Sequence, residues 1–187
     1  MLERNAANFT PLSPVSFLRR SAEVYPGKTA VIHGERSFTY RELDARCRRL
    51  ASALKKRGVG RGDTVAFMAP NVPALLEAHF AVPGIGGILN ALNYRLDAAT
   101  ITFCLEHGGA KVLITDREFS PVVRAALDNL NRKILVVDID DPLAVGGERL
   151  GSLEYEALLS EGDPAFTLES PADEWDSLSL LYTSGTT

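Results

Sequence analysis

The feature that most constrains the fold is a repeated alternation between short apolar runs and segments with helical periodicity. Residues 64–69 (TVAFMA), 111–115 (KVLIT) and 133–138 (KILVVD) are apolar runs of strand length, and helical patterns separate them. Strands joined by helices require crossover connections, which favour parallel pairing and a sheet covered on both faces. The sequence therefore predicts an α/β fold, with a mostly parallel sheet layered between helices on both faces.

A β-hairpin is expected before the first of these strands. Residues 29–33 (TAVIH) and 37–40 (SFTY) flank a short polar turn. Thr39 is followed three residues later by Glu42, which is the spacing of a capping box, so a helix is expected to begin there. That helix is expected to end at Gly58, because glycine is a common stop signal.

Further element boundaries follow from caps and breakers. Pro73 marks the start of a helix, and Asp97 caps another that stops at Gly108. Ser152 is expected to start a short helix, LEYEALLS. Residues 178–182 (LSLLY) are expected to form a last buried strand.

Composition limits the class of protein. The 187 residues suit one domain, and a net charge of −4 with a pI near 5.4 argues against a nucleic-acid partner. No uncharged run reaches the ~20 apolar residues of a membrane span, and the N-terminus does not resemble a secretory signal. Cys47 and Cys104 make no disulfide framework, so a cytoplasmic location is expected.

One predicted helix is strongly basic. Because its charges surround every non-core face and no aromatic residues interleave with them, we favour a solvated outer helix over a phosphate or nucleic-acid patch. The cations are Arg41, Arg46, Arg48, Arg49, Lys55, Lys56 and Arg57.

Isolated histidines and cysteines give no metal motif. Cys104 and His107 are one helical turn apart, but no second pair stands at usable spacing, so core packing is the favoured interpretation for Cys104. His33 and His79 also lack partners in the sequence.

The last residues have the composition of an anion-binding loop. Thr183, Ser184, Gly185, Thr186 and Thr187 follow the final predicted strand, where open α/β sheets place their ligands. Hydroxyl and backbone N–H groups donate hydrogen bonds to phosphate, and glycine lets the backbone turn tightly toward it. From composition alone, an ordinary polar turn stays an equal alternative.

Three stretches resemble the adenylate-forming enzymes, which include acyl-CoA synthetases, luciferases and adenylation domains of peptide synthetases. YTSGTT, residues 182–187, is similar to the first half of the family's phosphate loop, and SFTYREL, residues 37–43, resembles its early helix start. Residues 87–116 resemble the branch that activates fatty and other simple carboxylic acids, as do residues 173–187. The resemblance implies that residues 1–187 are the N-terminal part of the large domain, incomplete and without the small C-terminal domain.

The resemblance also implies a reaction and its cofactors. A carboxylate, with a fatty acid as the first choice, would attack ATP to give an acyl-adenylate, and coenzyme A would then displace AMP. Ser184, Gly185, Thr186 and Thr187 would bind the phosphates of ATP, and Thr183 would bind both the nucleotide and Mg²⁺. The catalytic residues would lie beyond Thr187, so none is assigned, and residues 1–187 alone are expected to be inactive.

Alternatives stay open from the sequence. The chain could be a truncated, non-catalytic remnant, or it could belong to an amino-acid adenylation domain that feeds a carrier protein. The expected partner is a small carboxylic acid, and a homodimer is one assembly that the sequence allows.

Overall fold

A computed structural model describes residues 3–5 and 7–183 of the chain. The helices are α1 (Pro14–Val24), α2 (Tyr40–Lys56), α3 (Pro73–Ala81), α4 (Ala98–His107), α5 (Ser120–Asp128) and α6 (Tyr155–Ser160), with 3₁₀ turns η1 (Pro83–Ile85) and η2 (Arg117–Phe119). The strands are β1 (Thr29–His33), β2 (Arg36–Thr39), β3 (Thr64–Met68), β4 (Ile88–Ala91), β5 (Ala110–Asp116), β6 (Leu135–Ile139) and β7 (Leu153–Glu154). No helix in this described part is long and apolar enough to cross a membrane.

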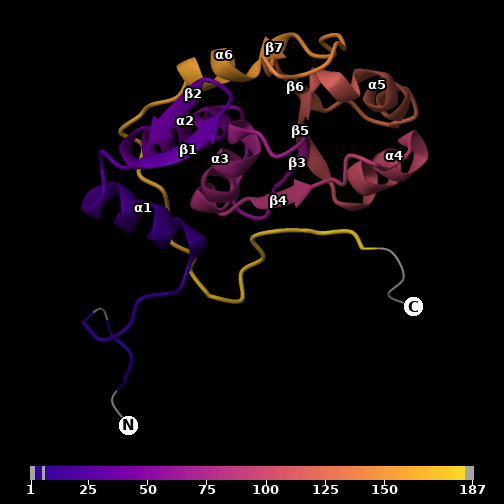
Figure 1. The fold of residues 1–187 in the computed structure, drawn as a ribbon. Helices are drawn as coiled ribbons and strands as arrows, with labels where there is room; N and C mark the ends of the chain where they lie inside the picture. The colour runs from indigo at the N-terminus through magenta and orange to yellow at the C-terminus, as the bar shows by residue number, and fades with distance from the viewer. Residues whose placement is uncertain (1–2, 6, 184–187) are drawn as a thin grey trace.

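Strands β3 to β7 form one parallel sheet in the order β4-β3-β5-β6-β7, and β1 and β2 form a separate antiparallel hairpin (Figure 1). β3 has a hydrogen-bonded neighbour on each side, since Thr64 aligns with Ile88 of β4 and with Ala110 of β5. The predicted α/β fold and the predicted hairpin are both confirmed.

The two faces of the sheet pack in separate cores. Val65 and Phe67 of β3 face a core shared with α2, α3 and α6, whereas Ala66 and Met68 face a core shared with α4 and α5. Every residue of β3 is buried. The covering helices stand on opposite sides of the sheet (Figure 1), as a parallel sheet requires.

Local capping signals are confirmed where the sequence places them. The Thr39 N–H donates to Glu42 Oε2 at 2.7 Å and the Glu42 N–H donates to Thr39 Oγ1 at 3.3 Å, which completes the capping box of α2. The bonds from Thr39 lower the pKa of Glu42 below its usual value. Asp97 caps α4 by accepting from the Thr100 N–H at 2.7 Å. Gly58 follows α2 with φ of +82°, a conformation that favours glycine.

The prediction that Ser152 starts a helix is wrong by three residues. Leu153 and Glu154 instead extend the sheet as β7, where they pair with Val137 and Asp138 of β6. The helix α6 begins after them, with Glu154 as its cap. A local pattern could not predict this pairing, because the partner strand lies outside the segment.

The predicted strand over residues 178–182 is reduced to one parallel bridge, between Ser179 and Leu89. Leu89 N–H donates to the Leu178 carbonyl at 3.0 Å, and Leu180 N–H donates to the Leu89 carbonyl at 2.9 Å. This final segment follows the outer edge of β4 (Figure 1). It is not a buried strand, because Leu181 is 64% exposed.

The prediction of a solvated outer face for α2 holds for its exposed cations and fails for its partly buried ones. Arg41, Lys55, Lys56 and Arg57 are exposed, whereas Arg46, Arg48 and Arg49 are partly buried. Residues 50–54 are all buried. Arg48 donates to the Phe166 carbonyl at 2.9 Å, Arg57 pairs with Glu161 at 2.7 Å, and Lys55 pairs with Glu169. The basic residues of α2 therefore bond a later part of the chain that crosses the helix.

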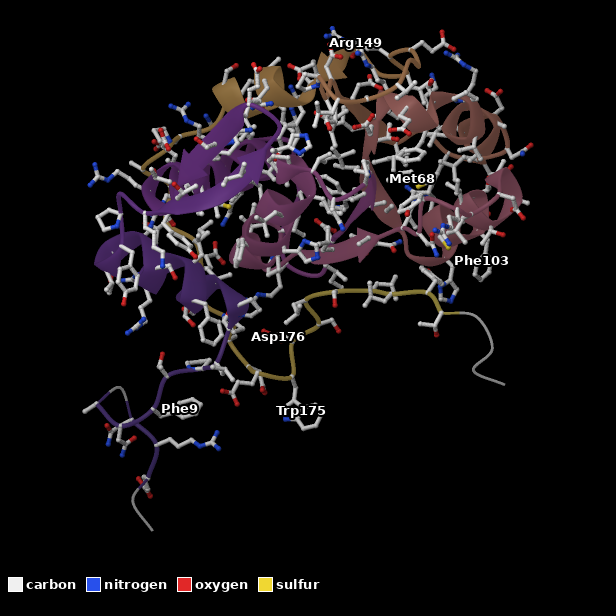
Figure 2. All side chains as sticks on the ribbon, viewed as in Figure 1. Phe9, Met68, Phe103, Arg149, Trp175 and Asp176 are labelled. Carbon is white, nitrogen blue, oxygen red and sulfur yellow. The ribbon has the colours of Figure 1, made fainter. Side chains whose placement is uncertain are left out.

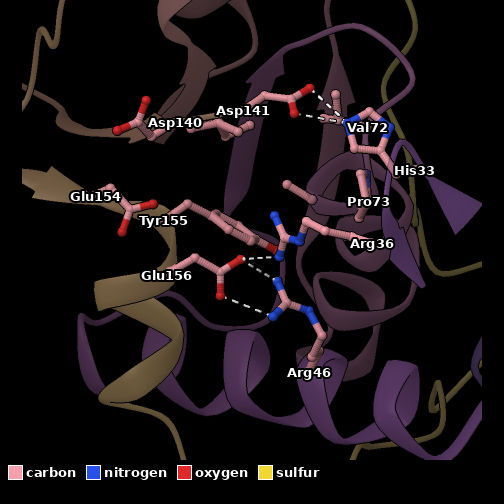
Figure 3. A pocket seen from close by; sticks show the side chains of 12 residues that line it. His33, Arg36, Arg46, Val72, Pro73, Asp140, Asp141, Glu154, Tyr155 and Glu156 are labelled. Carbon is pink, nitrogen blue, oxygen red and sulfur yellow. Dashed lines mark hydrogen bonds and ion pairs between the residues drawn. The ribbon is translucent and has the colours of Figure 1, made fainter. Parts of the chain in front are cut away.

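A buried ionic cluster joins α2, α3 and α6. Arg46 Nε donates to Glu77 Oε1 at 2.6 Å. The two Nη atoms of Arg46 bond Glu156 at 2.7 and 3.0 Å, as Figure 3 shows. The Tyr155 hydroxyl donates to Glu77 Oε2 at 2.7 Å. Glu77 is fully buried, and burial raises its pKa while Arg46 and Tyr155 oppose the shift. The cluster fixes three helices on one face of the sheet.

We expect Glu77→Leu to destabilise the intact protein by roughly 3 kcal/mol, because it removes the carboxylate that bonds both Arg46 Nε and the Tyr155 hydroxyl in the protein interior. Urea unfolding followed by circular dichroism measures the change. Glu23→Leu is the matched control, since its pair with Arg19 is exposed on both sides and contributes little. Equal, small effects of both substitutions would contradict the role of the cluster.

Candidate functional site

The strand order places a topological switch point at the carboxyl edge of the sheet, between β3 and β5. The chain leaves β3 through α3 on one face, and it leaves β5 through α5 on the other. Neighbouring strands whose connections diverge in this way leave room for a ligand outside their carboxyl ends. The Thr115 hydroxyl donates to the Met68 carbonyl at 3.3 Å, which ties the two strand ends together at this point.

Acidic side chains gather where β5 and β6 end, and most of them bond protein groups. Asp138 accepts from the N–H groups of Leu150 and Gly151 at 2.9 and 2.7 Å. Asp140 pairs with Arg117 at 2.7 Å. These bonds fold the loop after β6 back onto the sheet, so the two carboxylates are structural.

His33 brings the hairpin to the same edge. Its Nε2 lies 2.9 Å from both carboxylate oxygens of Asp141, and both side chains are largely buried (Figure 3). Sequence reasoning had no partner for His33, because Asp141 is 108 residues further along the chain.

Asp116, at the end of β5, differs from the other acidic residues. Its Oδ1 accepts from the Glu118 N–H at 2.9 Å, but its buried Oδ2 has no partner within the described part of the chain. Burial raises the pKa of Asp116 above its usual 3.8, the Glu118 N–H opposes this, and the nearby Asp141 adds to it. At this strand end, Asp116 Oδ2 and the Nε of the adjacent Arg117 are the buried polar atoms that contacts within the described residues leave without a partner.

We expect Asp116→Asn to be more stable than the wild type at neutral pH. Because the folded state binds this proton more tightly, the wild-type carboxyl group contributes stability that is present below pH 3.8 and lost as pH rises through the raised pKa. The Asp116→Asn variant should lack this decline, so its free energy of unfolding at pH 7 should be about 1 kcal/mol higher than that of the wild type. Urea unfolding at about pH 4 and pH 7 measures it.

Asp128→Asn, at the exposed end of α5, is the control. It should leave the free energy of unfolding unchanged at both pH values. An Asp116→Asn variant that is less stable than the wild type at both pH values would show that the carboxylate has a partner.

The final segment leads to the carboxyl edge, because it runs parallel to β4. Thr183 is exposed there. The other predicted phosphate-binding residues, Ser184, Gly185, Thr186 and Thr187, lie outside the described residues.

The predicted metal ligand has suitable chemistry. A threonine hydroxyl is a hard oxygen donor of the kind that Mg²⁺ binds, and Thr183 is exposed. Within residues 3–5 and 7–183, no group of three or more His, Cys, Asp or Glu side chains could hold a metal ion. The core position expected for Cys104 is confirmed, and burial raises the pKa of its thiol. His107 bonds the Tyr182 hydroxyl instead of acting with Cys104 as a ligand pair.

Two hollows adjoin His33. The one between the hairpin, α3 and β7 has a volume of about 30 Å³, which is room for about one or two waters (Figure 3). The other is a groove of about 290 Å³ between the hairpin and the start of α3. It is mostly apolar and is lined by Val31, Ile32, His33, Asn71, Val72, Pro73, Leu75, Leu76 and His79. Of the two, the groove has the size of a small-ligand site.

The profile of one family, described as AMP-binding enzyme, matches residues 18–187. This span includes the whole sheet and the helices that cover it. The chain belongs to the AMP-binding enzyme family. The resemblance to adenylate-forming enzymes is thus confirmed.

Similar curated proteins of this family include plant CoA ligases. The chain is 47% identical to "Acetate--CoA ligase CCL3" of Humulus lupulus and 44% identical to "Acetate/butyrate--CoA ligase AAE7, peroxisomal" of Arabidopsis thaliana. Each match covers 100% of this chain and 35% of the relative. The chain therefore spans about a third of the length of these AMP-binding enzymes.

Solved structures of the family have the same fold. The anthranilate CoA ligase AuaEII, in complex with anthranoyl-AMP, matches with a TM-score of 0.85 and 25% identity, over 98% of this chain and 35% of that one. A benzoate CoA ligase from Burkholderia xenovorans LB400 matches with a TM-score of 0.72 and 27% identity, over 84% of this chain and 30% of that one.

Proposed function

We propose that the intact protein is an ATP-dependent acid–CoA ligase and that this chain supplies the N-terminal part of its large adenylation domain. One observation carries the proposal: an AMP-binding family match over residues 18–187 ends in a Thr/Ser/Gly loop that follows a segment running to the carboxyl edge of the sheet. The names of similar proteins, acetate, butyrate and benzoate CoA ligases, support the reaction class.

The proposed roles follow from the charge problem of the reaction. A carboxylate must approach the polyanionic triphosphate, so oriented donors must stabilise the phosphates. Ser184, Gly185, Thr186 and Thr187 supply neutral hydroxyl and N–H donors, which orient phosphate without the grip of a charged side chain. Thr183 offers its hydroxyl to the nucleotide and to Mg²⁺. When bound, Mg²⁺ neutralises phosphate charge.

The acid is proposed to be a fatty acid from the short-chain end of the series. The acetate and butyrate in the names of two similar relatives support this choice. Coenzyme A is the proposed thiol acceptor. The cytoplasm stays the expected compartment, although one of those relatives is named as peroxisomal.

Two alternatives predict different results. An amino-acid adenylation domain would activate amino acids and pass them to a carrier protein. A non-catalytic remnant would end soon after Thr187 in its gene, whereas the reading frame of a ligase would continue with a glycine and a Pro-Lys-Gly group, by resemblance to the family. Residues 1–187 alone are expected to be inactive in either case.

We expect the intact protein to exchange labelled pyrophosphate into ATP only when a carboxylic acid is present. A panel of acetate, butyrate, a long-chain fatty acid, benzoate and a mixture of amino acids tests the substrate class. Exchange with butyrate or acetate is the expected result. Exchange with amino acids alone would support the adenylation-domain alternative.

We also expect Thr186→Val and Thr187→Val each to slow adenylation by ~10²–10³-fold, because each removes one oriented phosphate donor at nearly constant volume. Thr29→Val, on the exposed hairpin, is the matched control and should leave the rate unchanged. Full activity of both loop variants would assign the loop a structural role.

A further inference from the structure

Backbone pairing holds the final segment only as far as Leu180. The two bonds that Leu89 makes, to the Leu178 carbonyl and from the Leu180 N–H, are the backbone contacts of this segment with β4 in the described structure. A binding constellation must be held within about 0.5 Å of its productive geometry by supporting groups. Side chains must therefore position the chain between Leu180 and Thr183.

One such anchor is a hydrogen bond between Tyr182 and α4. The Tyr182 hydroxyl lies 2.8 Å from His107 Nδ1 and 3.4 Å from the Cys104 carbonyl oxygen. A tyrosine hydroxyl can donate to a bare Nδ1 or accept from Nδ1–H, so the bond persists in either tautomer of His107. Because protonated His107 also donates from Nδ1, the bond does not depend on its charge state.

Aromatic packing fixes the orientation of this pair. Phe103 stacks on His107 with ring centroids 5.2 Å apart, and both rings meet Tyr182 edge-on at 6.1 and 5.8 Å. Phe103 and His107 are four residues apart on α4 and so share one face. Figure 2 shows Phe103 on the side of α4 that is turned toward the final segment. Edge-to-face contacts of this kind favour one relative orientation of the rings.

A second anchor lies beside the first. A Cβ atom on Gly108 would stand 3.1 Å from Leu180 Cδ2, so the Leu180 side chain packs closely on the end of α4. Leu180 and Tyr182 are two residues apart in an extended segment and share one face. Both therefore rest on the C-terminal end of α4.

We propose that His107 is a positioning residue for the phosphate loop: through the Tyr182 hydroxyl it fixes the chain directly before Thr183 and so aligns the phosphate donors with the carboxyl edge. This inference deepens the proposed function and rests on it. It assigns a role in the ATP site to the end of α4, about 75 residues before the loop.

The test uses the intact protein with Tyr182→Phe, His107→Ala and the double variant. Misplacement of about 1 Å by a remote change can lower a rate by about 10²-fold. Each single variant should raise KM for MgATP and lower kcat/KM for MgATP in pyrophosphate exchange by about ten- to a hundred-fold, with KM for the acid unchanged. The double variant should be no worse than either single variant, because both remove the same bond.

Matched controls separate positioning from general damage. Tyr25→Phe and Asn129→Ala each remove a polar group at an exposed site beside another helix, and they should have no effect. His107→Asn should recover part of the loss, because its amide can reach the Tyr182 hydroxyl. A merely structural role would lower the active fraction and leave KM for MgATP unchanged, which would overturn the proposal.

A second readout does not depend on activity. Amide hydrogen exchange of residues 178–183 without nucleotide should be faster in Tyr182→Phe and His107→Ala than in the two controls. Unchanged amide hydrogen exchange of residues 178–183 in both variants would overturn the proposal, even if the wild type catalyses pyrophosphate exchange. A wild type that shows no pyrophosphate exchange would count against the proposed function alone. The amide hydrogen exchange of residues 178–183 would still test whether the Tyr182–His107 bond holds this segment in place.

Discussion

The backbone pairing of β3 with a parallel neighbour on each side determines most of the structure. Because β4 and β5 both run parallel to β3, the chain must cross over the sheet to reach each of them, and its helices must then cover both faces. The alternation of Val65 and Phe67 with Ala66 and Met68 supplies an apolar surface for each layer. The same pairing directs the connections after β3 and β5 to opposite faces, which makes this carboxyl edge a topological switch point.

Charged groups then hold this architecture in place over long sequence distances. Arg46 and Glu77 are buried together under α6, and Glu156 completes the guanidinium's contacts. At the carboxyl edge, Asp138 and Asp140 serve the loop after β6, while Asp116 keeps one oxygen without a partner among the described residues. The acidic residues of this region thus include carboxylates that bond the protein on both oxygens and one, Asp116, that keeps a buried oxygen without a partner in the described part of the chain.

The features that the sequence predicted well depend on neighbouring residues. The capping box of Thr39 and Glu42, the Asp97 cap and the apolar runs are local signals, so the hairpin, the helix starts and the parallel sheet follow from them. The features that it missed depend on distant contacts. β7 forms because β6 offers an edge, and α2 is covered because residues far along the chain bond its cations.

The candidate site shows the same division. Its location at the carboxyl edge follows from strand order, and its loop was recognised from composition and resemblance. Its supports could not be predicted, because Tyr182 meets His107 and His33 meets Asp141 only in the folded chain. The hydrogen-bond partner of an isolated histidine cannot be predicted from the sequence when that partner lies far along the chain.

A crystal structure of the intact protein with Mg²⁺ and a non-hydrolysable ATP analogue would test the central claim most directly. The account predicts that the triphosphate lies at the carboxyl edge of the sheet, within hydrogen-bond distance of residues 183–187. A nucleotide bound at the amino edge, or in the apolar groove between the hairpin and α3 without contact to this loop, would contradict it.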